Sequence, residues 1–120
     1  MKKQVLFISP NEESIIVLVS ILKNYEIVWA ANEAEIGSKL GDKFDCELII
    51  VEFDGWLIDS KEKFINYLND RYRRVPKLYI NCDSTLIGNR CLVNGNKIDF
   101  LERRIIEKEE IKDKVVKILG

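Results

Sequence analysis

The sequence contains no histidine among its 120 residues. Histidine is the side chain that titrates near neutral pH, the commonest metal ligand, and the usual base beside a catalytic serine or cysteine. Its absence argues against enzymes of those kinds and excludes a histidine that accepts phosphate. We predict a protein with no catalytic activity of its own, no bound metal and no cofactor.

Three further features narrow the class of protein. The 19 basic and 20 acidic residues nearly cancel, which leaves no overall attraction to nucleic acid or to an anionic membrane. No apolar run approaches the roughly 20 residues of a membrane helix. The three cysteines, Cys46, Cys82 and Cys91, lack metal-ligand spacing. We therefore expect reduced, mostly buried thiols in a cytoplasmic protein that binds neither nucleic acid nor membrane.

Short apolar runs alternate with segments of helical spacing along the chain. Runs rich in β-branched residues predict strands, and apolar residues three or four positions apart predict helices. The predicted strands cover residues 4–8, 25–30, 46–53, 77–80 and 97–101. The predicted helices cover residues 11–24, 32–40, 60–73, 83–93 and 108–119. Ser9 or Asn11 is expected to cap the first helix with its side chain.

This alternation of strands and helices predicts an α/β fold. Strands joined by helices become parallel neighbours through right-handed crossovers, with helices on both faces of the sheet. We expect a flavodoxin-like, doubly wound sheet of five strands in the order 2-1-3-4-5. No linker composition divides the chain. Residues 1–120 are therefore expected to form one domain, which could be the N-terminal part of a longer protein.

An acidic residue ends the third predicted strand, where parallel α/β sheets place functional groups. It is Glu52, in the segment ELIIVEFDGW, and Asp54 follows closely. With this acid and this order of elements, the whole chain resembles the CheY-like receiver domains of response regulators. The resemblance rests on the segments QVLFISPNEE, YEIVWAANEAE, CELIIVEFDGW, VPKLYINCDS and NGNKIDFLERR.

The resemblance implies a phosphorylation pocket, and this sequence departs from the family's pattern at most of its positions. The family holds Mg²⁺ with two acids after the first strand, where Ser9 and Pro10 stand here. Its phospho-accepting aspartate corresponds to Glu52, whose extra methylene moves the carboxylate by about 1.5 Å. The family's hydroxyl, lysine and aromatic positions fall on Asn81, Arg103 and Phe100.

We therefore predict a degenerate, or pseudo-, receiver domain that acts in two-component signalling by protein–protein contact without phosphorylation. Its partner would be a histidine kinase, an effector domain or another signalling protein. A direct ion pair between Glu52 and Arg103 would stand in for the phosphate. Glu52 then either mimics the phosphorylated state or is a relic that pairs locally.

Two alternatives remain open at this point. The first is an atypical, active receiver phosphorylated at Glu52 or Asp54, with Mg²⁺ held by residues such as Asn11, Glu12 or Asp54. The second is an unrelated flavodoxin-like binder of a small ligand. The segment SPNEE after the first strand lacks a glycine-rich phosphate loop, which counts against the second alternative.

The apolar run over residues 14–22 predicts a surface for association. In a helix, Ile15, Leu18, Val19 and Leu22 would share the face that covers the sheet. Three other apolar residues of the run would then point outward: Ile16, Val17 and Ile21. Because exposed apolar patches mark interfaces, we predict that these three contact a partner protein or a second copy in a homodimer.

A basic cluster follows the third predicted helix, with Arg71, Arg73, Arg74 and Lys77 close together. The balanced total charge and the lack of stacking side chains beyond one tyrosine argue against a nucleic-acid interface. Cations at the end of a helix are also favoured by its dipole. We expect a solvated helix end.

Overall fold

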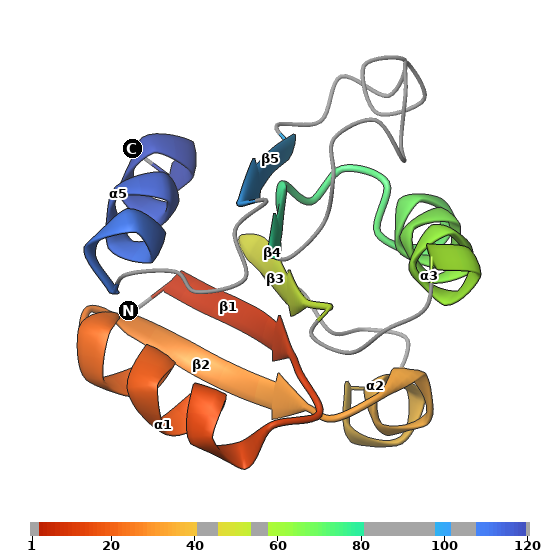
Figure 1. The fold of residues 1–120 in the computed structure, drawn as a ribbon, viewed down its shortest axis with the longest axis horizontal. Coiled ribbons are helices and arrows are strands. Elements are labelled where there is room, and N and C mark those ends of the chain that lie inside the picture. Colours follow the sequence, from red (N-terminus) through yellow and green to blue (C-terminus); the bar gives the residue numbers. More distant parts are fainter. Residues whose placement is uncertain (1–2, 41–45, 54–57, 81–97, 102–107, 120) are drawn as a thin grey trace.

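The computed structural model describes residues 3–40, 46–53, 58–80, 98–101 and 108–119 (Figure 1). The described strands are β1 (Lys3–Ile8), β2 (Tyr25–Ala30), β3 (Leu48–Glu52), β4 (Lys77–Ile80) and β5 (Ile98–Leu101). The described helices are α1 (Glu12–Ile21), α2 (Glu33–Leu40), α3 (Ile58–Arg71) and α5 (Lys108–Leu119). All of them overlap predicted elements, and the predicted helix over residues 83–93 lies outside the described residues. Among the described helices, none is long and apolar enough to cross a membrane.

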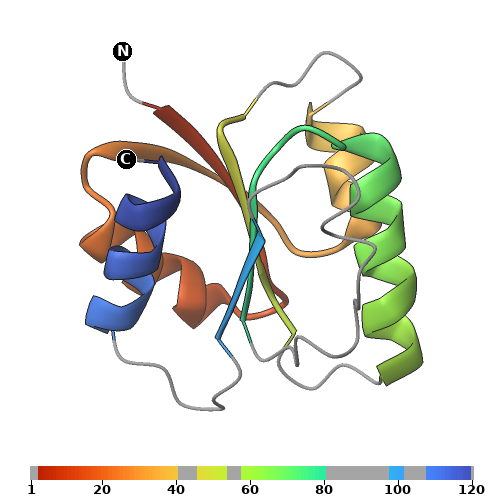
Figure 2. The ribbon, with the colours of Figure 1, turned by 90° about the horizontal axis from the view of Figure 1, so that it is seen from above.

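The strands form one parallel sheet in the order β2-β1-β3-β4-β5, which confirms the predicted fold class and strand order. Figure 2 shows α1 and α5 on one face of the sheet and α2 and α3 on the other. The chain therefore leaves β1 toward one face and β3 toward the opposite face. Where two neighbouring strands diverge in this way, an α/β sheet has a crevice at their carboxyl ends.

Alternate residues of the central strands contribute to two separate cores. In β1, Val5 and Phe7 are buried in the core beneath α1 and α5, whereas Leu6 and Ile8 are buried in the core beneath α2 and α3. Burying a side chain of this size contributes about 1.5–3 kcal/mol. Because both faces of the sheet are covered, the strands read as continuous apolar runs rather than as alternating patterns.

α1 is rotated about its axis relative to the prediction. Leu18 is buried, and Ile16 and Val17 are exposed, as predicted. The prediction was wrong for Val19, which is 50% exposed. It was also wrong for Ile21, which is half-buried and packs against the core beneath α1 and α5. The cause is α5, which lies beside α1 and gives Ile21 an apolar neighbourhood that the sequence pattern does not reveal.

The basic cluster after α3 is only partly solvated. Its three arginines are exposed, as expected, but Lys77 is fully buried, so the expectation was wrong there. Lys77 Nζ donates to the backbone carbonyl of Tyr72 at 2.7 Å and to that of Val75 at 2.8 Å. These carbonyls replace water around the ammonium group. Lys77 therefore holds the connection between α3 and β4.

Candidate functional site

The carboxyl ends of β1 and β3 bring Ser9 and Glu52 together. Ile8 pairs with Val51 in the register of these strands, so the next residue of each strand lies beside the other. Side chains alternate between the two faces of a sheet. Glu52 therefore shares the face of Ile50, which is buried in the core beneath α1 and α5. Register and alternation together aim the carboxylate toward the start of α1.

Three side chains donate hydrogen bonds to one oxygen of the Glu52 carboxylate. Oε1 accepts from the Ser9 hydroxyl at 3.0 Å, from the Ser14 hydroxyl at 2.9 Å and from the Asn11 amide nitrogen at 3.2 Å. Hydrogen bonds to an ionised acceptor are roughly twice as strong as neutral ones. We call these four side chains the Glu52 network.

Ser9 holds the network from the interior of the protein. Its side chain is fully buried, and its hydroxyl donates to Glu52 while accepting the backbone N–H of Asn11 at 3.1 Å. The backbone N–H of Ser9 donates to the Ala30 carbonyl at 3.2 Å. Its own carbonyl accepts the indole N–H of Trp29 at 2.9 Å. Every polar atom of Ser9 is thus bonded within the fold, which fixes the direction of its hydroxyl.

The Glu52 carboxylate lies at the amino end of α1. Asn11 is the N-cap residue of this helix, but its side chain makes no capping hydrogen bond, and Ser9 bonds Asn11 instead of the helix. The predicted side-chain cap was therefore wrong. The Asn11 amide is directed at Glu52 because a carboxylate accepts its hydrogens. The partial positive charge at the start of a helix also favours an anion at this position.

Phe53 holds the end of β3 in place. Its ring is 1% exposed, stacks on Tyr79 with ring centroids 5.8 Å apart, and meets Phe64 edge-on at 6.3 Å. Its backbone N–H donates to the Ile80 carbonyl at 3.0 Å. Because Phe53 is fixed in the core beneath α2 and α3, the preceding Glu52 is held on the opposite face.

Three other predicted pocket positions lie outside the described residues. They are Asp54, Asn81 and Arg103. Two of the three cysteines, Cys82 and Cys91, also lie outside the described residues. The predicted ion pair between Glu52 and Arg103 therefore stays a prediction. Phe100 is described as a backbone position of β5, where it pairs with Tyr79 of β4. The described side-chain hydrogen bonds of Glu52 go to the segment between β1 and α1 and to the first turn of α1.

Sequence reasoning missed two residues of this site, Ser14 and Trp29. Ser14 is the polar residue that opens the apolar run of α1, in the first turn of the helix. The sequence feature that could have identified it is a hydroxyl residue in the first turn of the helix, close to the sheet edge from which the helix starts. Trp29 stands one residue before the end of β2 and reaches Ser9 through its indole nitrogen.

No protein-family model matches this sequence, and no curated protein matches it. Solved structures match it along nearly its whole length. The chemotaxis response regulator CheY4 of Vibrio cholerae matches with a TM-score of 0.73 at 15% identity, over 98% of this chain and 99% of that one. A response regulator from Thermotoga maritima matches with a TM-score of 0.72 at 18% identity, over 99% of this chain and 98% of that one.

A third match is the receiver domain of the sensor histidine kinase PA1611 from Pseudomonas aeruginosa, whose structure has a magnesium ion coordinated in its active-site cleft. Its TM-score is 0.65 at 18% identity, over 100% of this chain and 99% of that one. The chain has the fold of a response regulator receiver domain. In this receiver fold, the Glu52 network stands where β1 and β3 end.

The described residues at that edge do not fit a magnesium ion. Mg²⁺ requires several oxygen ligands in octahedral arrangement and is usually bound through carboxylates. Here Glu52 Oε1 already accepts three hydrogen bonds, and Ser9, Asn11 and Ser14 direct their hydrogens at it. Pro10 is exposed and has no ligand in its side chain. Within the described ranges, no group of three or more acidic, cysteine or histidine side chains could hold a metal ion.

Proposed function

We propose that the chain is a receiver domain of two-component signalling that acts through phosphorylation-independent contact with a protein partner. The fold supports the signalling class, since response regulators and a kinase receiver share it over nearly their whole length. The observation that carries the phosphorylation-independent part is the Glu52 network, in which three donors converge on one carboxylate oxygen.

The Glu52 network opposes phosphorylation of Glu52. A carboxylate nucleophile attacks phosphorus with an oxygen lone pair, and here three donors, Ser9, Asn11 and Ser14, withdraw charge from the carboxylate through Oε1, which makes it a weaker nucleophile. A divalent cation normally offsets the charge that approaches such a carboxylate. Ser9 and Pro10 supply no carboxylate to bind that cation, so this requirement of the reaction is not met by these two residues.

The network gives Glu52 a structural role in place of a chemical one. It joins the end of β3 to the first turn of α1 through hydrogen bonds of 2.9–3.2 Å. The domain is then held in one arrangement without a phosphoryl group. These bonds support local pairing of Glu52 with α1, and the pairing with Arg103 stays a prediction.

The partner in this proposal is a cytoplasmic signalling protein, which is a histidine kinase, an effector domain or another protein of the signalling pathway. Residues 1–120 act as one domain, with no catalysis and no cofactor of their own. A surface that is constant in shape suits constitutive binding, because no ligand is needed to shift its population.

Incubation with Mg²⁺ and acetyl phosphate, followed by intact-mass spectrometry, tests the proposal. We expect no gain of a phosphoryl group. The receiver domain of PA1611, whose structure holds Mg²⁺, is the positive control. A phosphoryl gain that Glu52→Gln abolishes would show that Glu52 is an acceptor and would refute the proposal. A gain that Asp54→Asn abolishes would refute it equally and would identify Asp54 as the acceptor.

A further inference from the structure

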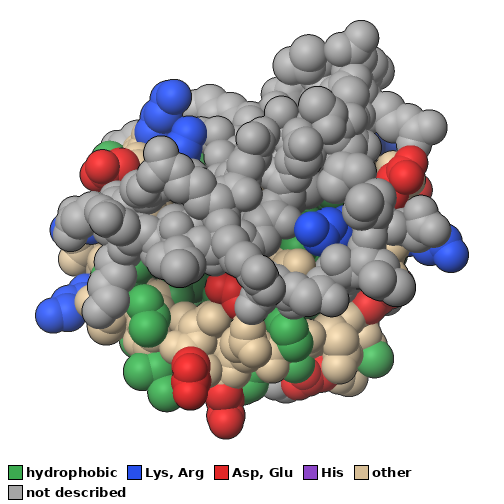
Figure 3. Space-filling model, in the orientation of Figure 1, with side chains coloured by type: hydrophobic (Ala, Val, Ile, Leu, Met, Phe, Trp, Pro, Cys, Tyr) green, Lys and Arg blue, Asp and Glu red, His purple; other side chains and the backbone are tan. Residues whose placement is uncertain are grey.

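α1 presents a stripe of exposed apolar side chains to solvent. Ile16 is 69% exposed and Val19 is 50% exposed, although both belong to a helix whose opposite face is buried in the core. Figure 3 shows hydrophobic side chains beside acidic ones over α1. Such a stripe on a small domain marks a surface that associates with another molecule.

The stripe has an ordered sequence of side chains. Glu12, Ile16, Val19 and Lys23 follow one another at steps of four, three and four residues. This spacing keeps Glu12, Ile16 and Val19 on one side of the helix and is the spacing of a coiled-coil seam, and Lys23 follows the C-cap residue Leu22. All four are exposed, with Glu12 opening the helix and Lys23 just beyond its end. The stripe is therefore apolar in the middle, acidic at one end and basic at the other.

We propose that this stripe binds the same stripe of a second copy, with the two α1 helices antiparallel. A two-fold symmetric contact must be self-complementary. In one antiparallel register, Ile16 faces the partner's Val19 and Glu12 faces the partner's Lys23. The same register thus pairs the apolar residues with each other and the opposite charges with each other. A parallel arrangement would instead place Glu12 against Glu12.

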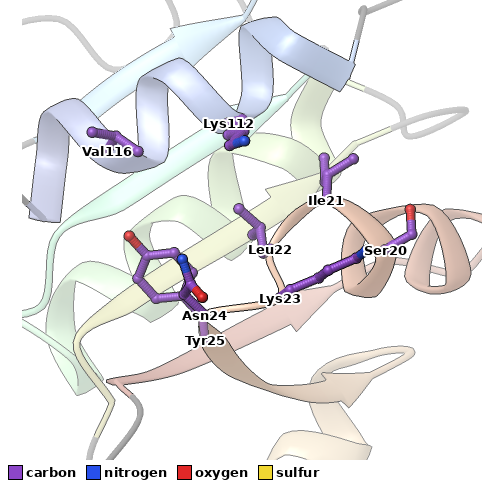
Figure 4. A pocket seen from close by; sticks show the side chains of 8 residues that line it. All are labelled: Ser20, Ile21, Leu22, Lys23, Asn24, Tyr25, Lys112 and Val116. Atoms are coloured by element: carbon purple, nitrogen blue, oxygen red, sulfur yellow. The ribbon is translucent and has the colours of Figure 1, made fainter.

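A hollow beside α1 adds to this charge complementarity. It has a volume of about 410 Å³ and lies between the end of α1, the start of β2 and α5 (Figure 4). Lys23 and Lys112 line it together with Tyr25 and Val116, and none of the described residues that line it is acidic. An antiparallel partner brings the acidic first turn of its α1, with Glu12 and Glu13, to this basic end.

Figure 4 also shows how the hollow lies relative to the end of α1. Ile21 points from α1 toward α5 and closes the inner wall of the hollow, whereas Lys23 lies at the outer side of the helix end (Figure 4). Val116 is 48% exposed and continues the apolar surface onto α5. The dimer contact therefore runs along the outer side of α1, from Glu12 at its start to the hollow against α5.

The dimer is independent of the proposed function. Neither Ser9, Ser14 nor Glu52 belongs to the stripe, so the dimer forms whether or not Glu52 accepts phosphate. If one proposal fails, the other still holds, because the phosphorylation test depends on Glu52 and the association test depends on the residues of the stripe.

Sedimentation velocity of the full chain tests the contact, at concentrations from about 1 µM to about 1 mM, a range that covers weak association. We expect a reversible shift from monomer to dimer. Ile16→Glu should raise the dissociation constant at least about tenfold, because it places a charge in the apolar middle of the seam. Ala34→Glu is the control, since it adds the same charge to an exposed position of α2 on the other face of the sheet.

Charge exchange tests the antiparallel register. Glu12→Lys and Lys23→Glu should each weaken self-association, because each leaves like charges facing across the seam. An equimolar mixture of the two variants should associate more strongly than either alone, since every charge then meets its opposite. Glu62→Lys on α3 should leave association unchanged.

Three results would overturn the proposal. A monomer throughout the concentration range would mean that the stripe serves a different protein or none. A dimer insensitive to Ile16→Glu would place the contact elsewhere. A dimer that Ile16→Glu weakens but whose charge variants do not prefer each other would contradict the antiparallel register. Circular dichroism of each variant separates loss of contact from loss of fold.

Discussion

The Ser14 hydroxyl donates to Glu52 Oε1 at 2.9 Å and joins the first turn of α1 to the carboxyl end of β3. The two residues are 38 positions apart in the sequence. Ser9 and Asn11 bond the same oxygen from the segment between β1 and α1. The network lies at the edge of the sheet where α/β proteins bind ligands. It should therefore govern both the stability of the fold and access to that edge.

Replacing Ser14 by alanine removes one of the three donors. We expect the free energy of unfolding to fall by about 1–2 kcal/mol, since hydrogen bonds to charged groups contribute about 1.5–3 kcal/mol and two donors remain. Urea titration measures the change. Ser20→Ala is the matched control in the same helix, because its exposed hydroxyl bonds the Val17 carbonyl. That change should stay within about 0.5 kcal/mol. Equal losses in the two variants would contradict the network.

Replacing Glu52 by glutamine keeps the length of the side chain and removes its charge. Because neutral hydrogen bonds are about half as strong, we expect a loss of about 1–2 kcal/mol in the free energy of unfolding. In that background, Ser14→Ala should cost less than in the unaltered chain. A double-mutant cycle should give a coupling energy of about 0.5–1 kcal/mol. Additive losses would mean that Ser14 and Glu52 do not interact.

The rotation of α1 is tested by two neighbouring residues. Leu18 is 2% exposed and Val19 is 50% exposed. Leu18→Ala should lower the free energy of unfolding by about 2–4 kcal/mol, as buried leucines do when truncated. Val19→Ala should change it by less than about 1 kcal/mol, partly because alanine is the better helix former. Thermal and urea unfolding both report the difference, and comparable losses would restore the orientation predicted from the sequence.

The Tyr67 phenol should make the free energy of unfolding depend on pH in the alkaline range. Burial raises its pKa above the ordinary value of 10.0, Arg71 opposes the rise, and Tyr72 and Glu33 add to it. The folded chain therefore holds this proton more tightly than the unfolded chain does. Its contribution to stability is complete below the unfolded pKa of about 10 and is lost as the pH rises through the folded pKa.

Urea unfolding between about pH 9 and pH 11 detects this effect around the ordinary tyrosine pKa. The free energy of unfolding of the Tyr67→Phe variant should fall less steeply with pH than that of the unaltered chain, because the variant has no phenol to titrate at this position. Tyr25→Phe controls for the loss of a tyrosine in a strand. Identical slopes for Tyr67→Phe and the unaltered chain would contradict the raised pKa.

The sheet could be predicted from the sequence because its strands are covered on both faces. Segments such as 5–8 and 48–51 are apolar at every position and are separated by helical segments, so the order of elements follows directly. The orientation of α1 could not be predicted in the same way. Residues 15–19 are all apolar, so their pattern does not show which face of the helix is buried. Packing against α5 decides which of these residues are buried.

The position of Glu52 could be predicted, but its partners could not. A carboxylate at the end of a buried strand is visible in the sequence. Which donors meet it depends on the register of β1 against β3 and on the direction in which α1 leaves the sheet, and both are tertiary features. The burial of Lys77 could not be predicted for the same reason. A lysine in a basic cluster is expected at the surface, and only the tertiary structure places the carbonyls of Tyr72 and Val75 around its ammonium group.

A titration with Mg²⁺ and beryllofluoride tests the central claim, that the Glu52 network leaves no working phosphorylation pocket. Trp29 is the reporter, since its indole donates to the Ser9 carbonyl at 2.9 Å. The chain has two tryptophans, so Trp56→Phe isolates the signal. We predict no fluorescence change up to about 10 mM Mg²⁺, with or without beryllofluoride, a generous ceiling for one carboxylate. A saturable change that requires both ligands would contradict the account.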